Sequence, residues 1–268
     1  KFTNVDKYLK SNKKTLDELT IEDCKIIMKY PIKILLTIIV ILWTAKFKSF
    51  SQSNENQTIE VHNKLTQKEF DEGWKLLFDG KKIKGWRYYD SDSRQIKGWT
   101  VSNGHLHKPL GIKAGNIMTN KIYDNYIFSW EWKLEDRGNN GVKYFITEER
   151  KSAIGHEYQM IDDKKVEDPY SSNGSFYLIV KPVDGKPNLP MGSWNHSRII
   201  VKGNNVEHWL NGIKILSYVC GSNEVMGRVP KTKFKKVWKF GEKIKGHILL
   251  TDHTDACWYR NIKIKELP

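Results

Sequence analysis

From Phe70 to the end of the chain, short runs of alternating apolar and polar residues follow one another. This alternation is typical of strands that turn one face to a core and the other to solvent. Turn-forming pairs such as Asn103-Gly104 and Asn211-Gly212 separate the runs, and Asn-Gly suits the tight turns of β-hairpins. The pattern predicts an all-β fold, an antiparallel sandwich or barrel, because no helical periodicity of useful length follows. The predicted strands are 127–134, 141–146, 157–161, 176–180, 197–201, 206–210, 248–250 and 258–264.

The residues before this domain have a different composition. Residues 28–51 combine a basic start at Lys29 and Lys33, an apolar run from Ile34 to Trp43, and small residues before Gln52. This is the pattern of a secretory signal peptide. The apolar run is shorter than the about 20 residues that a membrane span needs. An uncleaved N-terminal anchor is the alternative.

These features predict the organisation of the chain. We expect residues 1–27 to be an upstream extension, 28–51 the signal peptide, 52–69 a polar linker and 70–268 the β domain. The mature protein is then expected in the periplasm or at the cell surface, with no stable membrane insertion after signal removal. Cys220 and Cys257 would remain in it, and their spacing leaves open whether they form a disulfide, since geometry controls pairing.

The charge of the chain bears on its partners. Lys and Arg number 45 against 31 Asp and Glu, a net charge of +14, and aromatic residues make up 12%. The aromatic content excludes a disordered protein. No basic motif with the geometry of a nucleic-acid reader occurs, so we expect no nucleic-acid partner. The sequence also contains no G-x-S-x-G, H-E-x-x-H or P-loop pattern.

Several short motifs follow one another in an order known from one protein family. They are Gly73–Lys81 with Gly85-Trp86, Trp99–Leu106, Asn139–Phe145, Gly155–Asp163, Gly192–Asn195, Val206–Gly212 and Gly246–Ile264. Over roughly residues 70–268 the chain resembles the 3-keto-disaccharide hydrolase domain family, which is common in Bacteroidetes. The resemblance implies a concanavalin-A-like jelly-roll sandwich, export, and a carbohydrate substrate oxidised at C3. The chain departs from the family at Thr251 and Thr254, where relatives carry Gln and Gly, and around Tyr177-Leu178, where relatives tend to carry Asp.

The implied reaction defines what the site must contain. A ketone at C3 makes the C2 proton acidic, so a base can remove it and the group at C1 can leave by β-elimination, after which water adds. The site needs a base, an acid for the leaving oxygen, and a group that stabilises the enolate. No cofactor is certain, but a divalent metal could supply that stabilisation.

Candidate site residues begin with the strand 157–161. Glu157 and Gln159 share one face of it, opposite the apolar residues. We expect Glu157 to be a general acid/base or a metal ligand and Gln159 to bind sugar hydroxyls; an ordinary solvent-facing surface is the alternative. Lys143, in the strand 141–146, is a candidate for stabilising the ketone or enolate.

The remaining candidates lie in other segments. Asp252 and His253 follow an apolar strand, and a histidine suits base catalysis near neutral pH. Trp194, in a loop, could stack on a sugar ring, and Asn140 is a further candidate for binding substrate. His208 shares a face with Val206 and Leu210, so it either lines a binding groove or is buried in the core.

Two hypotheses of function follow. The first is an exported hydrolase or lyase that acts on 3-keto-glycosides by elimination. Glu157 has no acidic neighbour at positions 159 or 161, which argues against the paired-carboxylate mechanism of glycosidases. The second is a carbohydrate-binding module without catalysis on the same sandwich. A structural domain of the cell envelope, recognised by a large exposed apolar patch, is a third reading.

Overall fold

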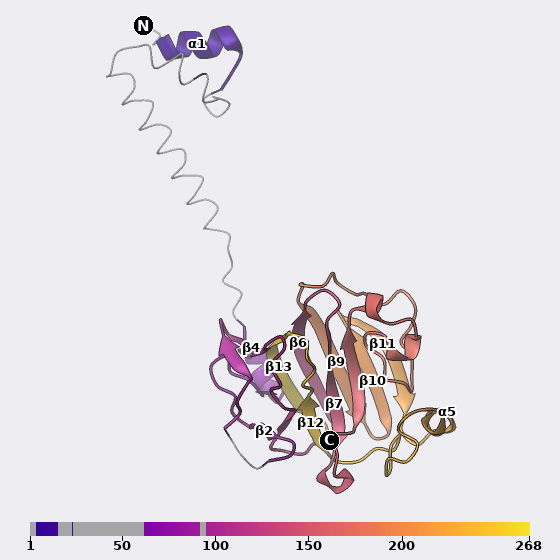
Figure 1. Ribbon diagram of the computed structural model, residues 1–268. Helices are drawn as coiled ribbons and strands as arrows, with labels where there is room; N and C mark the ends of the chain where they lie inside the picture. The colour runs from indigo at the N-terminus through magenta and orange to yellow at the C-terminus, as the bar shows by residue number, and fades with distance from the viewer. Residues whose placement is uncertain (1–3, 16–22, 24–61, 92–94) are drawn as a thin grey trace. The chain divides into compact units, whose positions relative to one another are not determined.

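The computed structural model describes residues 4–15, 23, 62–91 and 95–268, in two separate units, Lys1–Glu60 and Val61–Pro268 (Figure 1). In the first unit, helix α1 (Asn4–Asn12) carries Tyr8, whose hydroxyl donates to Asp23 at 2.7 Å. The predicted signal peptide, residues 28–51, lies outside the described residues. None of the helices that the structure does describe has the length and apolarity needed to cross a bilayer.

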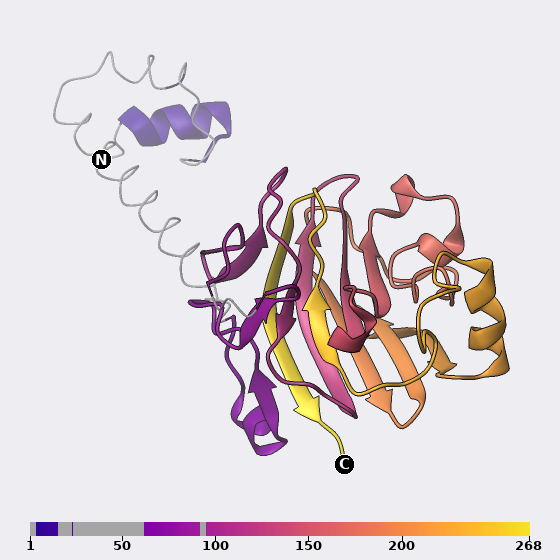
Figure 2. The same ribbon diagram turned by 60° about the horizontal axis from the view of Figure 1, so that its bottom comes forward.

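The second unit is a β-sandwich. Its described strands form a larger and a smaller antiparallel sheet that pack face to face (Figures 1 and 2). The larger sheet has the order β11-β10-β9-β6-β13-β4-β3, with β1 also paired to β13, and the smaller sheet has the order β2-β5-β12-β7-β8. The predicted all-β sandwich is therefore confirmed.

The strand bounds are as follows. The larger sheet contains β1 (Trp74–Leu76), β3 (Thr100–Ser102), β4 (His105–Lys108), β6 (Tyr126–Leu134), β9 (Asn195–Lys202), β10 (Asn205–Leu210), β11 (Ile213–Val219) and β13 (Cys257–Glu266). The smaller sheet contains β2 (Trp86–Tyr88), β5 (Ile117–Thr119), β7 (Asn139–Ile146), β8 (His156–Ile161) and β12 (His247–Leu250). Short helices lie at the edges: α4 (Gln67–Asp71), α5 (Asn223–Arg228) and the 3₁₀ turns Glu148–Arg150, Asp163–Lys165, Pro169–Ser171 and Val229–Lys231.

The core lies between the two sheets and is rich in aromatic rings. Trp130, Trp132, Tyr158 and Phe176 are fully buried there. Trp130 meets Tyr158 edge to face with ring centres 5.1 Å apart, the geometry that aromatic pairs favour. Burial of such large apolar surfaces is the main force that holds the sheets together.

The three consecutive antiparallel strands β9, β10 and β11 follow the predicted alternation of apolar and polar side chains. Val206 lies opposite Val201 in β9 and opposite Tyr218 in β11. At the turn, Asn211 and Gly212 both have positive φ, 46° and 86°, as a type I′ turn requires.

Residues 176–180 do not form the predicted strand. Phe176 bridges Tyr158 on one side and Val180 on the other, so the chain reverses within a few residues. Leu178 adopts a φ of 66° at this reversal. Phe176 and Ile179 are buried, so this short turn needs apolar residues at these positions. Its composition therefore resembles that of a strand.

The predicted linker, 52–69, ends earlier than expected. Asn63 is buried, and its backbone and side chain exchange hydrogen bonds with Asn261 of β13, at 2.6 and 2.8 Å. Thr66 caps α4 in a capping box with Glu69. Residues 62–69 are therefore part of the folded domain.

The two cysteines of the domain are unpaired. Cys220 and Cys257 are both buried free thiols. Burial raises the pKa of the Cys220 thiol to about 12, so it stays protonated and unreactive.

Candidate active site

Glu157 lies on the outer face of the smaller sheet. Its neighbours in β8, His156, Tyr158 and Met160, point into the core and are fully buried, as the predicted alternation requires. Glu157 is only 7% exposed because the surrounding strands and loops cover it. A carboxylate in such a place is a candidate for chemistry, since burial of a charge is costly unless it is paired.

Lys143 is the cationic partner of Glu157. The two residues lie directly opposite each other in the ladder of β7 and β8, and Lys143 Nζ is 3.9 Å from Glu157 Oε2. The ammonium group also donates to the carbonyl oxygen of Ala153 at 3.2 Å. Its position is therefore fixed from two sides, with the lysine pointing into the same space as the carboxylate.

His253 completes the cluster from the loop between β12 and β13. Burial lowers the pKa of its imidazole below the ordinary value of 6.5, while the negative charge of Glu157 raises that pKa and the positive charge of Lys143 lowers it. The ring is thus within electrostatic reach of both residues. In the described parts of the chain it makes no hydrogen bond to another side chain or backbone group, so a neutral imidazole is available to a ligand.

Asp252 faces away from this cluster. Its Oδ1 lies 3.3 Å from Nζ of Lys108, which is fully buried, and its Oδ2 accepts a hydrogen bond from the Gly115 backbone at 2.7 Å. Asn116 accepts the Asp252 backbone N–H at 2.8 Å. These contacts anchor the loop that carries His253, which makes Asp252 a positioning residue in this structure.

Gln159 continues the row of Glu157 along the outer face. Its Nε2 donates to Oδ1 of Asn139 at 2.9 Å, and its side chain is 4% exposed. The same face carries a buried apolar cluster of Met118, Ile146 and Leu249 on the neighbouring strands. The outer face of the smaller sheet is therefore polar at β8 and apolar at β5.

Sequence reasoning did not include Tyr177 among the site residues. The Tyr177 backbone donates to the carbonyl of Glu157 at 3.1 Å, and Phe176 bridges Tyr158. Residues opposite each other in a ladder share a face. Phe176 and Tyr158 share the core, so Tyr177 and Glu157 share the outer face. The alternation of side chains within 176–180 indicated that Tyr177 and Phe176 point to opposite faces. The pairing of this segment with β8 could not be inferred from that alternation.

Asn140 and His208 are inside the sandwich. Asn140 Oδ1 accepts from the Thr251 hydroxyl at 2.7 Å and is fully buried. His208 is hydrogen bonded to the Tyr144 hydroxyl and to the Gly174 carbonyl, both at 2.8 Å, and burial lowers its pKa to about 3. Neither side chain reaches the outer face, so a sugar bound there would not touch them. This corrects the expected role of these residues in substrate binding.

Trp194 lies on the outer face of the larger sheet rather than beside Glu157. The Arg260 guanidinium is 4.2 Å from the centre of its ring, and Lys133 Nζ is 5.3 Å from it. The His105 ring is 4.8 Å away. Trp194 is half-buried among these groups and is not part of the cluster around Glu157, and its stacking on a sugar stays a prediction.

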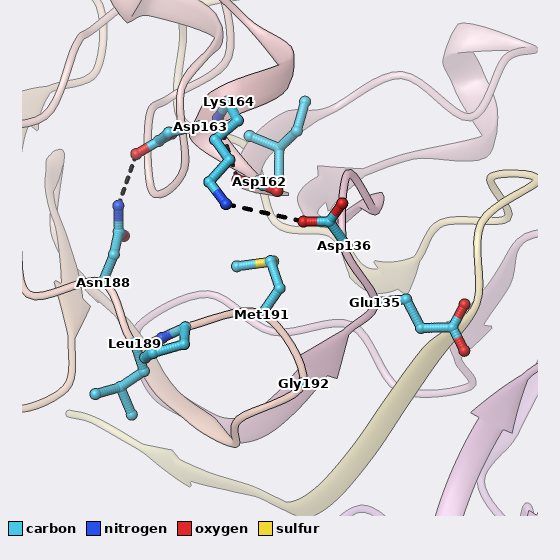
Figure 3. Close-up of a pocket in the computed structure, with 11 residues that line it drawn as sticks. Glu135, Asp136, Asp162, Asp163, Lys164, Asn188, Leu189, Met191 and Gly192 are labelled. Carbon is cyan, nitrogen blue, oxygen red and sulfur yellow. Dashed lines mark hydrogen bonds and ion pairs between the residues drawn. The ribbon is translucent and has the colours of Figure 1, made fainter.

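A cavity of about 700 Å³ opens at the end of the sandwich (Figure 3). Ile161, which shares the outer face with Glu157 and Gln159, is part of its wall, about 13 Å along β8 from Glu157. Figure 3 shows Lys164 reaching Asp136 and Asn188 reaching Asp163 around Met191. The cavity is therefore lined by apolar residues such as Ile161 and Met191 and by acidic residues. It lies at the Ile161 end of β8.

Comparison with known proteins identifies the family. The model of the 3-keto-alpha-glucoside-1,2-lyase-like domain matches residues 73–265. The chain belongs to this family. The predicted resemblance is thus confirmed, and the match spans both sheets of the sandwich.

Three similar proteins come from Bacteroides thetaiotaomicron and Parabacteroides distasonis. A 3-keto-disaccharide hydrolase of Bacteroides thetaiotaomicron is 27% identical over 231 residues, which cover 73% of this chain and 79% of the relative. A crystal structure of a protein assigned as a glycosyl hydrolase from Parabacteroides distasonis is 33% identical, with a TM-score of 0.70, over 78% of this chain and all of that one. A second such structure from the same organism is 27% identical, with a TM-score of 0.58, over 72% and 99% of the two chains.

A divalent metal, which the sequence left open, has no evident ligand set among the described residues of the lyase-like domain. Across the described residues, no group of three or more His, Cys, Asp or Glu side chains is arranged to hold a metal. Glu157 instead has Lys143 as its charged neighbour.

Proposed function

We propose that this protein is an exported enzyme that cleaves the glycosidic bond of 3-keto-glycosides by elimination followed by hydration. The observation that carries the proposal is the pair of Lys143 and Glu157, 3.9 Å apart on the outer face of the smaller sheet, with His253 in the loop after β12 close enough for both charges to act on its pKa. The family match and the name of the Bacteroides relative support the class of substrate.

In the elimination step, His253 acts as the base. Its lowered pKa keeps the imidazole neutral at physiological pH, so it can accept the C2 proton. The electron pair of the C2–H bond enters the enolate, whose oxygen the Lys143 ammonium stabilises. As the enolate collapses to the C1=C2 double bond, the bond from C1 to the leaving oxygen breaks and protonated His253 donates its proton to that oxygen.

In the hydration step, Glu157 acts on water. Its carboxylate accepts a proton from a water molecule while the water oxygen adds to C1 and the electrons return to the enolate. The enolate is then protonated at C2 from Glu157, which restores the 3-keto sugar and the carboxylate. Gln159 binds hydroxyl groups of the sugar, and the cavity beside Ile161 has room for a second sugar ring.

The test is turnover by the full chain. A 3-keto-disaccharide and its unoxidised parent are incubated with the protein, with and without a chelator, and free sugar is measured. We expect release from the keto sugar alone, and Glu157→Gln should lower kcat by about 10²- to 10⁴-fold.

The control is Glu207→Gln, because Glu207 lies on the larger sheet and pairs with Lys214 at 3.1 Å. Binding of both sugars without release of either would instead identify a carbohydrate-binding module, and loss of activity in chelator would reveal a metal requirement.

Export is the second part of the proposal. The apolar run from Ile34 to Trp43 and the small residues before Gln52 support a cleaved signal peptide at residues 28–51. Expression of the full chain in a Bacteroidetes host, followed by fractionation and N-terminal sequencing, tests it. A mature N-terminus near Gln52 in the periplasm or at the surface is expected, whereas an intact cytoplasmic chain would contradict export.

A further inference from the structure

A segment at the open edge of β8 connects the candidate active site to a second cavity. The Gly174 backbone donates to the Gln159 carbonyl at 2.7 Å, and the Tyr177 backbone donates to the Glu157 carbonyl at 3.1 Å. We call residues 174–181 the edge segment. On its other side it contacts the chain around α5, which lies at this border of the sandwich (Figure 2).

Arg228 is held rigidly against this segment. Its guanidinium lies 3.8 Å from the centre of the Tyr170 ring, and its Nε donates to the Leu178 carbonyl at 3.1 Å. Within the described residues, Nη1 and Nη2 have no hydrogen-bond acceptor. The side chain is therefore oriented by protein contacts while its two terminal nitrogens remain available.

Arg228 lines a cavity of about 540 Å³. Lys181 and Lys231 also line it, together with the ring of Tyr170 and the carboxylate of Glu224. In the part of the chain that the structure describes, no carboxylate comes within 4.0 Å of the charged nitrogens of Arg228, Lys181 or Lys231. Three cations thus share one cavity with a single acidic side chain that pairs with none of them.

Ion pairs hold several lysines elsewhere in the domain. Lys165, Lys186 and Lys243 each contact an aspartate at 3.0, 2.9 and 2.7 Å. The positive region also continues towards the active site, since Lys233 Nζ lies 4.7 Å from the centre of the Tyr177 ring. The Tyr177 backbone donates to the carbonyl of Glu157, so the edge segment joins the two regions.

We propose that the cavity around Arg228 binds the anionic group, a carboxylate or a sulfate ester, of an acidic saccharide. A guanidinium with two free terminal nitrogens matches the paired oxygens of such groups, and an oriented one loses little entropy on binding. The aspartates at the other cavity, Asp136 and Asp163, are paired with Lys164 and Lys186, so the unpaired cations around Arg228 are the better place for an anionic group. The inference rests on the proposed function only in taking the partner to be a saccharide.

The test compares two probes by calorimetry with the full chain. One is a sulfated maltooligosaccharide and the other its uncharged parent of the same length. We expect the sulfated probe to bind about tenfold more tightly or better. The triple variant Lys181→Gln/Arg228→Gln/Lys231→Gln should lose this preference. The matched control Lys84→Gln/Lys113→Gln/Lys202→Gln has the same net charge, changes three exposed lysines elsewhere, and should keep it.

The remaining outcomes overturn the inference. Equal binding of both probes, or equal loss of preference in the two triple variants, would show that only net charge matters. Binding to phosphatidylglycerol vesicles without preference for the sulfated probe would identify an anionic surface as the partner. None of these measurements needs turnover, and release of sugar from a neutral 3-keto-disaccharide should be the same in both triple variants, so failure of this inference is separable from failure of the proposed function.

Discussion

Gly141 and Glu157 are packed so closely that any side chain at position 141 would displace the Glu157 carboxylate. A Cβ atom on Gly141 would stand 2.3 Å from Oε1 of Glu157. The carboxylate therefore lies directly on the backbone of β7, and Gly141 is required there for close approach rather than for an unusual φ. This contact, with Lys143 on the same strand, fixes where the carboxylate points.

Gly141→Ala should therefore impair turnover more than folding. The added methyl group displaces the Glu157 carboxylate, and a displacement of about 1 Å in a catalytic group costs about 10²-fold in rate. Steady-state kinetics on a 3-keto-disaccharide should show a fall mainly in kcat. Gly203→Ala is the comparison, because its φ of 57° disfavours alanine while no atom lies within 4 Å. That variant should lose about 1–2 kcal/mol of stability and no activity; the reverse pattern would refute the packing argument.

The sequence predicted the parts of the site that depend on a single strand. Alternation within β8 was enough to separate Glu157 and Gln159 from the core residues between them. The motif order identified the family, and Asn211-Gly212 predicted the turn of the β10-β11 hairpin.

The remaining parts depend on register between strands, which side-chain alternation within one strand does not determine. The pairing of Lys143 with Glu157 follows from the register of β7 against β8, and the role of Tyr177 follows from that of the edge segment. His208 shows the same limit. The sequence correctly placed it on the same strand face as Val206 and Leu210, but it did not show that this face packs against the other sheet. The burial of Asp252 against Lys108 joins residues that are far apart in the chain.

The buried pair of Lys108 and Asp252 should be necessary for a stable domain. Lys108→Met leaves the Asp252 carboxylate without its cation, and loss of one partner of a buried pair typically costs about 3–5 kcal/mol. Urea unfolding should show this loss, and the double variant Lys108→Met/Asp252→Asn should recover most of it because no charge stays buried. If the double variant were no more stable than Lys108→Met, the ion pair would not explain the effect.

The pH dependence of turnover should report on His253. Burial lowers the pKa of its imidazole, so kcat/KM should stay constant down to pH 6.5 and fall only below it. Lys143→Gln removes a charge that lowers this pKa, so the acidic limb of the profile should move to higher pH. Glu157→Gln removes a charge that raises the pKa, so the limb should move to lower pH. Shifts in the same direction in both variants, measured on the residual activity, would exclude His253 as the titrating base.

A second group of histidines should make the stability of the domain sensitive to acid. In the core, Tyr144 is hydrogen bonded to His208 at 2.8 Å and to Tyr218 at 2.6 Å, and Tyr218 is hydrogen bonded to His156 at 2.8 Å. Burial lowers the pKa of His208 to about 3 and that of His156 well below 6.5. Both stay neutral in the folded state at pH values where the unfolded chain already takes up protons.

The direction of the effect follows from this difference. Above pH 6.5 neither state binds a proton at His208, so its full contribution to stability is present, and the contribution is lost as the pH falls from 6.5 towards 3. Between pH 7.5 and 4.5 we expect a loss of about 3 kcal/mol from His208 alone. Urea unfolding at the two pH values measures it. His208→Gln should be less stable than the wild type at pH 7.5 but lose less on acidification, and an unchanged loss would mean that other groups cause the acid sensitivity.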